Sequence, residues 1–322
     1  MKLFVRAALA ALCLVASASA SAANWPSSPV KLVVPSGPGS SPDLFARVLA
    51  ASMQQRLGQA VFVENKNGAS GSMGMDAVSR SPADGYTLGI AFPAPLTTNA
   101  LMMKKMTYDS RKDLKLLTNA VLQPTVLVIG KHLPAKNFAE FAELLRKNPG
   151  KYNSASTGAS SLGRLLAEAF VYQLGTRVEN IVYAGAAPTM TALMRGDVDF
   201  AFLPAAGAMA FVQSDKVRLV ALAAPRRSTL LAGVPTLKEL GVPGIDASNW
   251  LGIVSPAALA PELAGRIRQE VIAALQTPEM KKLLADNYME VVGSTSEEFA
   301  ATVDQDTQRW KPLIEKLAIT ID

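Results

Sequence analysis

Three loops rich in glycine and serine carry the residue types in this chain that could hold a small anion. Each loop follows an expected strand and precedes an expected helix. The first turn of a helix has unpaired N–H groups and a partial positive charge, so it can bind an anion without a cationic side chain. Glycine lets a ligand approach the backbone, and serine hydroxyls add hydrogen-bond donors. The loops are Ser36-Gly37-Pro38-Gly39-Ser40-Ser41, Gly68-Ala69-Ser70-Gly71-Ser72 and Thr157-Gly158-Ala159-Ser160-Ser161.

A simpler interpretation is that these loops are only tight turns and helix caps. We favour ligand binding, because open parallel sheets bind ligands at the carboxyl ends of their strands, and three such loops would surround one cleft between two lobes. A carboxylate that accepts four or five hydrogen bonds there, at about 1.5–3 kcal/mol each, could reach the roughly −8 kcal/mol of micromolar affinity. An arginine is therefore not required.

Two charged residues beside the loops have more than one interpretation. Asp43 is at the second position of an expected helix, where its charge is favourable; it could also orient the first loop or meet an ammonium group. Arg164 follows the third loop and could reach a second ligand carboxylate across the cleft. It also precedes Glu168 by four residues, and a surface ion pair explains it equally well.

The residues for catalysis, metal binding and cofactor binding are few. The chain has one histidine, His132, and one cysteine, Cys13, so a Cys/His zinc site cannot be built and a Ser-His-Asp triad would require His132. Gly37-Pro38-Gly39 resembles the start of a dinucleotide fingerprint, but Pro42 takes the place of its third glycine. We therefore predict no catalytic residues, no metal and no cofactor.

The first residues predict export. Lys2 and Arg6 precede an apolar run over residues 7–16, and small residues continue to Ala23. We expect a signal peptide over 1–23 that is cleaved near Ala23, which places the mature protein in the periplasm without Cys13. The formal net charge of +6 falls to +4 when Lys2 and Arg6 are removed. Such a small, scattered excess does not predict nucleic-acid binding. We expect no direct membrane anchoring, because no segment after the signal peptide has the pattern of a membrane span.

Strand and helix patterns alternate along the rest of the chain, as in an α/β protein with mostly parallel sheets. The long extended stretch 114–130 is expected to cross between two lobes, and residues 248–254 to cross back. Helices alone are expected after that, over 261–276, 278–287 and 295–317. We therefore expect lobe 1 to comprise 24–122 and 250–322, and lobe 2 to comprise 123–249.

A set of short motifs in fixed order over essentially the whole mature chain resembles the extracytoplasmic receptors of tripartite tricarboxylate transporters, also called Bug receptors. The motifs include Trp25-Pro26, Val33-Val34-Pro35, Asp84-Gly85-Tyr86-Thr87-Leu88, Tyr183-Ala184-Gly185, Gly196-Asp197-Val198-Asp199 and Val234-Pro235-Thr236. The resemblance implies a type II periplasmic-binding-protein fold, with two Rossmann-like lobes, two crossover strands and a ligand cleft between the lobes. It also implies membrane transporter subunits as partners, and we expect a monomer.

The resemblance further implies that a small carboxylate is held mainly by backbone groups and water, from Ser36 to Ser41, Ser70, Gly71, Ala91, Phe92, Gly158, Ser160, Ser161, Tyr183 and Gly185. Arg164 stands where relatives often have histidine, so the ligand could be a dicarboxylate, an amino acid or an aromatic acid. One alternative is a receptor that senses the same ligand and signals through a membrane kinase. A more distant alternative is a secreted serine hydrolase.

Overall fold

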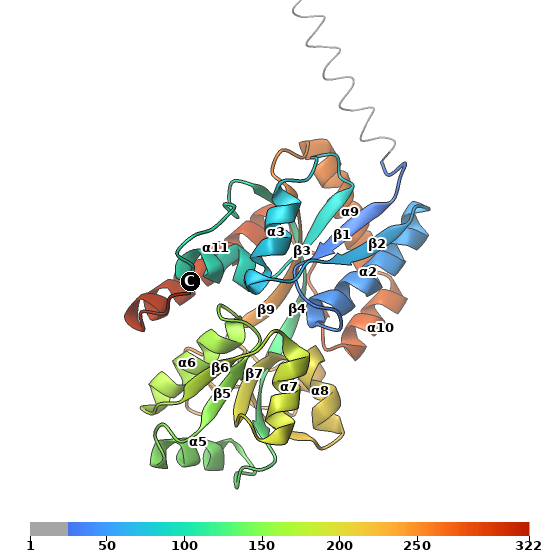
Figure 1. Ribbon diagram of the computed structural model, residues 1–322. Coiled ribbons are helices and arrows are strands. Elements are labelled where there is room, and N and C mark those ends of the chain that lie inside the picture. The colour runs from blue at the N-terminus through green and yellow to red at the C-terminus, as the bar shows by residue number, and fades with distance from the viewer. Residues whose placement is uncertain (1–24, 246, 322) are drawn as a thin grey trace, which may run out of the picture.

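The computed structural model describes residues 25–245 and 247–321, and the predicted signal peptide lies outside the described residues. The fold is α/β, with two lobes that follow one another along a pair of long strands (Figure 1). The strand order is β2-β1-β3-β9-β4-β7-β5-β6, and β8 and β10 also pair with β4. This is the two-lobed binding-protein fold that the sequence predicts.

The sheet of the first lobe is built on β1 (Val30–Val34), which pairs in parallel with β2 (Val61–Asn65) and β3 (Thr87–Ala91). Helix α2 (Ser41–Leu57) follows β1, and α3 (Ser72–Ser79) follows β2. The buried face of α2 packs with α9 (Pro261–Leu275) and α10 (Pro278–Asp286) around one hydrophobic core. The loops after β1 and β2 therefore open at the same edge of the sheet, because parallel strands end together.

The sheet of the second lobe is built on β5 (Asn153–Ser156), which pairs in parallel with β6 (Glu179–Val182) and β7 (Phe200–Pro204). Its helices are α5 (Phe138–Lys147), α6 (Leu162–Leu174), α7 (Ala186–Arg195) and α8 (Ala205–Gln213). An aromatic cluster fills the core under α5 and α6, and its rings belong to Phe138, Phe141, Phe170, Phe200 and Phe202.

Strand β4 (Leu114–Gly130) joins the two sheets. Its first part pairs antiparallel with β9 (Ser248–Pro256), and its second part pairs antiparallel with β7 and with β8 (Val217–Leu222). Strand β9 in turn pairs with β3 in the first lobe. The two stretches expected to cross between the lobes are thus neighbouring antiparallel strands.

The segment between β3 and β4 lies against the second lobe. It contains the π-helical turn η2 (Ala94–Thr98) and the short helix α4 (Asn99–Met102). The C-terminal helix α11 (Ser296–Lys316) contacts both of these and α6, so Trp310 and Ile314 share a core with residues of the second lobe. The short strand β10 (Glu290–Val291), the turn η1 (Ala69–Gly71) and the turn η3 (Thr229–Leu231) complete the elements. Within the described part of the chain, no helix combines the length and the apolar character needed to cross a membrane.

Candidate functional site

A cavity of about 250 Å³ lies between the lobes, where the strands of both sheets end. The first lobe contributes residues 35–42, Asn67, Ser70, Gly71 and 92–94 to its lining. The second lobe contributes 157–158, 161–163, 184–188, Phe202, Pro204 and Gly207, and the crossing strands contribute Thr125 and Asn249. All three loops identified in the sequence therefore meet at one cavity.

Most of the predicted binding residues line this cavity. They are Ser36, Gly37, Pro38, Gly39, Ser40, Ser41, Ser70, Gly71, Phe92, Gly158, Ser161 and Gly185. Five predicted residues are not part of the lining, namely Asp43, Ala91, Ser160, Arg164 and Tyr183. Each of these five has a structural role that explains its position.

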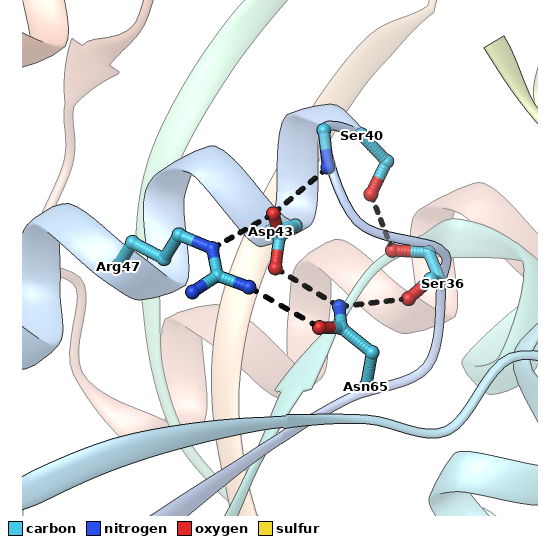
Figure 2. A network of polar contacts seen from close by, with 6 residues as sticks. Ser36, Ser40, Asp43, Arg47 and Asn65 are labelled. Atoms are coloured by element: carbon cyan, nitrogen blue, oxygen red, sulfur yellow. Dashed lines mark hydrogen bonds and ion pairs between the residues drawn. The ribbon is translucent and has the colours of Figure 1, made fainter. Parts of the chain in front are cut away.

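Asp43 holds the first loop in shape (Figure 2). Its Oδ2 accepts hydrogen bonds from the Gly39 N–H at 2.9 Å and from Arg47 Nε at 3.0 Å. Its Oδ1 accepts from Asn65 Nδ2 at 2.9 Å, and the same amide donates to the Ser36 carbonyl at 3.0 Å. The carboxylate is 2% exposed, so it orients the loop from the protein interior and not from the cavity. This agrees with the interpretation of Asp43 as a residue that orients the loop.

The charged form of Asp43 is favoured in the folded protein. Burial alone would raise its pKa, but the hydrogen bonds from Arg47, Gly39 and Asn65 outweigh burial and hold the pKa of Asp43 below its ordinary value. A carboxylate whose pKa is lowered by folding stabilises the protein above the unfolded pKa, and this contribution is lost as the pH falls through the folded pKa.

We therefore expect Asp43→Asn to lower the free energy of unfolding by about 2 kcal/mol at neutral pH, since a neutral amide cannot replace a carboxylate that accepts from Gly39, Arg47 and Asn65. The difference from the wild type should begin to shrink below roughly pH 4, where aspartate in the unfolded chain becomes protonated, and it should be lost as the pH falls through the lowered pKa of Asp43 in the folded protein. Urea unfolding of both proteins at a series of pH values measures it. An equal difference at pH 7 and pH 3 would contradict this role.

Three helices begin at the cavity without a side-chain cap. They are α2, α7 and α8, whose N-cap residues are Ser40, Gly185 and Pro204. The Ser40 hydroxyl is hydrogen-bonded to that of Ser36 at 2.7 Å. Apart from Pro42 in α2 and Pro188 in α7, which have no N–H, the first residues of these helices have N–H groups without an acceptor in the helix, so these groups are available to an anion in the cavity. The sequence had predicted such starts for α2, α3 and α6, but it did not reveal α8.

Helix α6 differs from these three, because its N-cap Ser161 accepts a hydrogen bond from its own Arg164 N–H at 3.3 Å. The neighbouring Ser160 is fully buried, and its hydroxyl is hydrogen-bonded to Oδ1 of Asn99 in α4. Its carbonyl accepts from the Thr98 hydroxyl at 2.8 Å. Ser160 therefore joins the two lobes, whereas the sequence had suggested that its hydroxyl faces a ligand.

Arg164 is directed along its own helix. Its Nη1 donates to the Ala159 carbonyl at 2.8 Å, and its Nε lies 4.0 Å from Glu168 Oε1. Burial raises the pKa of Glu168, while the charge of Arg164 acts in the opposite direction. Of the two interpretations of Arg164, this geometry agrees with the ion pair with Glu168.

Ala91 and Tyr183 are adjacent to lining residues without lining the cavity themselves. Ala91 is the fully buried last residue of β3, next to Phe92. Tyr183 follows β6, where its N–H donates to the Ser156 carbonyl at 2.8 Å, and the side chain packs against the core that contains Met190. Both residues fix the backbone conformation beside residues that line the cavity.

The sequence did not identify the residues that the crossing strands and β7 bring to the cavity. They are Thr125 on β4, Asn249 on β9, and Phe202 and Pro204 at the end of β7. These positions come together only through strand pairing over long distances in the chain, as between Gln123 and Asn249. The polar residues Gln123 and Thr125 in the middle of the long extended stretch 114–130 were the available signal.

His132 lies at the opposite end of the second lobe from the cavity. Its Nε2 is 2.9 Å from Oδ1 of Asp199, which precedes β7, whereas the cavity meets β7 at Phe202 and Pro204. From Asp199 to Pro204 the strand rises by roughly 16 Å. Because His132 is the only histidine in the sequence, no loop serine at the cavity has a histidine base. This geometry gives no support to a serine hydrolase.

The cavity lining has no charge of its own. Among the residues that the structure describes, no Lys, Arg, His, Asp or Glu belongs to it. Its polar groups are backbone amides and the hydroxyls or amides of Ser36, Ser40, Ser41, Asn67, Ser70, Thr125, Thr157, Ser161 and Asn249. Such a site can bind and release a small molecule, and the described residues contain no group of three or more metal-binding side chains.

Comparison with known proteins identifies the family. The family model described as tripartite tricarboxylate transporter family receptor matches residues 45–319. Protein BugT of Bordetella pertussis is 31% identical over 301 residues, which is 92% of each chain.

Two solved structures share the fold closely. R. palustris Rpa4515 with adipate is 27% identical, has a TM-score of 0.88, and the match covers 92% of this chain and 99% of that one. MatC from Rhodopseudomonas palustris with bound malate is 25% identical, has a TM-score of 0.83, and the match covers 90% of this chain and 100% of that one. The chain therefore belongs to the receptors of the tripartite tricarboxylate transporter family, which are periplasmic solute-binding proteins.

Proposed function

We propose that this receptor binds a small carboxylate in the cavity between its lobes and delivers it to the membrane subunits of a tripartite tricarboxylate transporter. The protein acts in the periplasm as a monomer, after removal of the signal peptide 1–23. Lobe 1 comprises 24–122 and 250–322, and lobe 2 comprises 123–249. The twelve lining residues that the sequence predicted make the contacts, and the lobes close around the ligand.

The observation that supports this function is the meeting of uncapped helix starts from both lobes at an uncharged cavity. Helix α2 belongs to the first lobe, and helices α7 and α8 belong to the second. An anion between them accepts hydrogen bonds from both lobes at once, which stabilises the closed arrangement relative to an open one. The positive ends of the helices supply the electrostatic attraction that a cationic side chain would otherwise supply.

The relatives support a carboxylate in particular. Rpa4515 has adipate, and MatC has malate, and both share the fold over nearly the whole chain. A carboxylate is compact enough for a cavity of about 250 Å³ and has two oxygens that can accept bonds from helix starts of different lobes.

A thermal-shift screen against monocarboxylates, dicarboxylates, amino acids and aromatic acids tests this function, followed by calorimetry on the acids that bind. At 100 times its dissociation constant, a true ligand adds roughly 2.7 kcal/mol to the stability of the protein. Uptake is tested by deleting the gene and measuring accumulation of the labelled ligand. A protein that binds none of these acids would not be a carboxylate receptor.

Gly39→Val is expected to weaken carboxylate binding by at least tenfold. Gly39 lines the cavity with a φ of 75°, which a β-branched residue adopts only with strain, so the loop that presents the α2 start must change. Calorimetry measures the loss of affinity.

Gly58→Val is the matched control. Gly58 lies at the other end of the same helix with a φ of 64°, and a Cβ at either glycine would meet nothing within 4 Å. Both variants should lose similar stability, about 1–2 kcal/mol. Only Gly39→Val should lose affinity, and an equal loss in both variants would remove the first loop from the binding site.

A further inference from the structure

Thr125 has a buried hydroxyl that no protein group satisfies. It lies on β4 where this strand passes between the lobes, and it lines the cavity. Its side chain is 2% exposed, and among the described residues its Oγ1 has no hydrogen-bond partner. A buried hydroxyl without a partner costs about 1–3 kcal/mol, which is recovered when a bound molecule presents a donor or an acceptor to it.

The position of Thr125 relative to the α2 start follows from strand geometry. Gln123 and Thr125 are two residues apart on β4, so their side chains point to the same face of the strand, with Cα atoms roughly 7 Å apart. The Ser41 hydroxyl donates to Gln123 Oε1 at 2.6 Å, which fixes the first turn of α2 against this face. Thr125 is therefore close to the place where the proposed carboxylate meets α2.

A second unsatisfied group lies on the same face. Gln123 is 1% exposed, and its Nε2 has no hydrogen-bond partner among the described residues, although its Oε1 accepts from Ser41. Two neighbouring buried polar groups without partners are uncommon in a folded protein. Gln123 is not part of the cavity lining, so Thr125 is the member of this pair that can meet a polar group of the ligand beside the carboxylate.

The chemistry of the surroundings restricts that polar group. The described lining has no charged side chain, and apolar residues such as Phe92, Leu162 and Phe202 take part in it. A second charge placed against Thr125 would be buried with only a neutral hydroxyl as its partner, which is unfavourable. A neutral oxygen avoids this cost, because a hydroxyl or a keto group can pair with a threonine hydroxyl.

We propose that Thr125 is a specificity-determining residue that selects carboxylates with a neutral hydroxyl or keto oxygen on the carbon next to the carboxylate. This inference rests on the proposed function and names the ligand class of the same cavity. Thr125 discriminates between acids that differ in this one substituent, because an acid without it leaves the Thr125 hydroxyl unpaired.

Three matched sets of acids test the proposal, each differing only in the substituent at carbon 2. The sets are propionate, lactate, pyruvate and alanine; succinate, malate, oxaloacetate and aspartate; and phenylacetate, mandelate, phenylglyoxylate and phenylglycine. Calorimetry should show that the hydroxy or keto member of a bound set binds the wild type at least about tenfold more tightly than the unsubstituted member.

Thr125→Val removes the hydroxyl at nearly constant shape, and it should reduce this preference to within about threefold, whereas Thr125→Ser should restore it. Thr87→Val is the matched control, since Thr87 is a buried threonine on β3 outside the cavity lining. It should keep the wild-type preference. Melting temperatures of all variants confirm that each is folded.

Two results would overturn the proposal while leaving a carboxylate receptor intact. One is tightest binding of the unsubstituted or the ammonium member in every bound set, and the other is an unchanged preference in a folded Thr125→Val variant. Binding of another acid in the thermal-shift screen, with no member of any set bound, would also overturn the inference and leave the proposed function standing. If no acid in that screen binds the wild type, the proposed function and this inference both fail. A crystal structure of the complex should place the neutral ligand oxygen within hydrogen-bond distance of Thr125 Oγ1.

Discussion

Gly163→Ala is expected to destabilise the protein by about 1–3 kcal/mol and to weaken ligand binding. Gly163 is the second residue of α6, and a Cβ there would lie closer than 3.0 Å to the backbone carbonyl oxygen of Phe202. A backbone atom in a buried strand cannot move aside easily, so helix and strand must separate. Because Gly163 and Phe202 both line the cavity, this separation changes the site as well. Urea unfolding and calorimetry measure the two effects.

The matched control is Gly265→Ala in α9. Gly265 is also inside a helix, but a Cβ there would meet nothing within 4 Å, and the residue does not line the cavity. Alanine has a higher helix propensity than glycine, so this variant should gain about 0.5–1 kcal/mol and keep its affinity. If both variants were stabilised, close packing of α6 on β7 would not be what requires glycine at position 163.

Much of the fold could be predicted because local signals and tertiary structure agree. The apolar stretch 114–130 interrupted by Gln123-Pro124 is one strand, β4, which serves both sheets. Helix α11 begins where the helix over 295–317 is expected, and Thr295 and Glu298 form a capping box at its start. Helix α8 was not predicted, because its sequence AAGAMAFVQ is apolar up to its last residue and shows no helical alternation with polar residues.

The site was predictable where its residues lie on continuous loops. It was less predictable where the direction of a side chain decides whether the residue lines the cavity. Residues 36–41 all line the cavity, since the whole loop faces it. Ser160 and Ser161 are neighbours in the sequence, yet Ser161 lines the cavity and Ser160 is turned toward Asn99. Nothing in the sequence around residue 160 shows that the segment with Asn99 packs there. Likewise, the place of Thr125 in the cavity lining depends on the way in which the two sheets share strand β4.

The contact between Asn99 and Ser160 has a functional consequence, because it joins the two lobes beside the cavity. Asn99 is fully buried, and its Nδ2 lies 2.7 Å from the Ser72 hydroxyl and 3.2 Å from the Ser70 carbonyl, both in the first lobe. Its Oδ1 accepts from the Ser160 hydroxyl of the second lobe. Asn99 thus orders the second loop and, through one further bond, favours the closed arrangement.

We expect Asn99→Ala to lower ligand affinity by roughly 10- to 100-fold. The variant loses a buried inter-lobe hydrogen bond and leaves its partners unpaired, which destabilises the closed state relative to the open state by about 1.4–2.8 kcal/mol. Calorimetry measures the affinity, and small-angle scattering should show a larger radius of gyration for the variant without ligand.

Two further variants separate lobe closure from loss of local structure. Ser160→Ala removes only the inter-lobe bond to Asn99, whereas Ser72→Ala removes only bonds within the first lobe, to Asn99, Met103 and Met106. If Asn99 acts through closure, Ser160→Ala should lose affinity in the same way as Asn99→Ala, while Ser72→Ala should lose stability with little change in affinity. The reverse order of effects would mean that Asn99 only supports the second loop. The ligand favours the closed state through its own contacts with both lobes. A hydrogen bond that already joins the lobes lowers the free energy of closure that these contacts must supply. Its removal therefore appears directly as weaker binding.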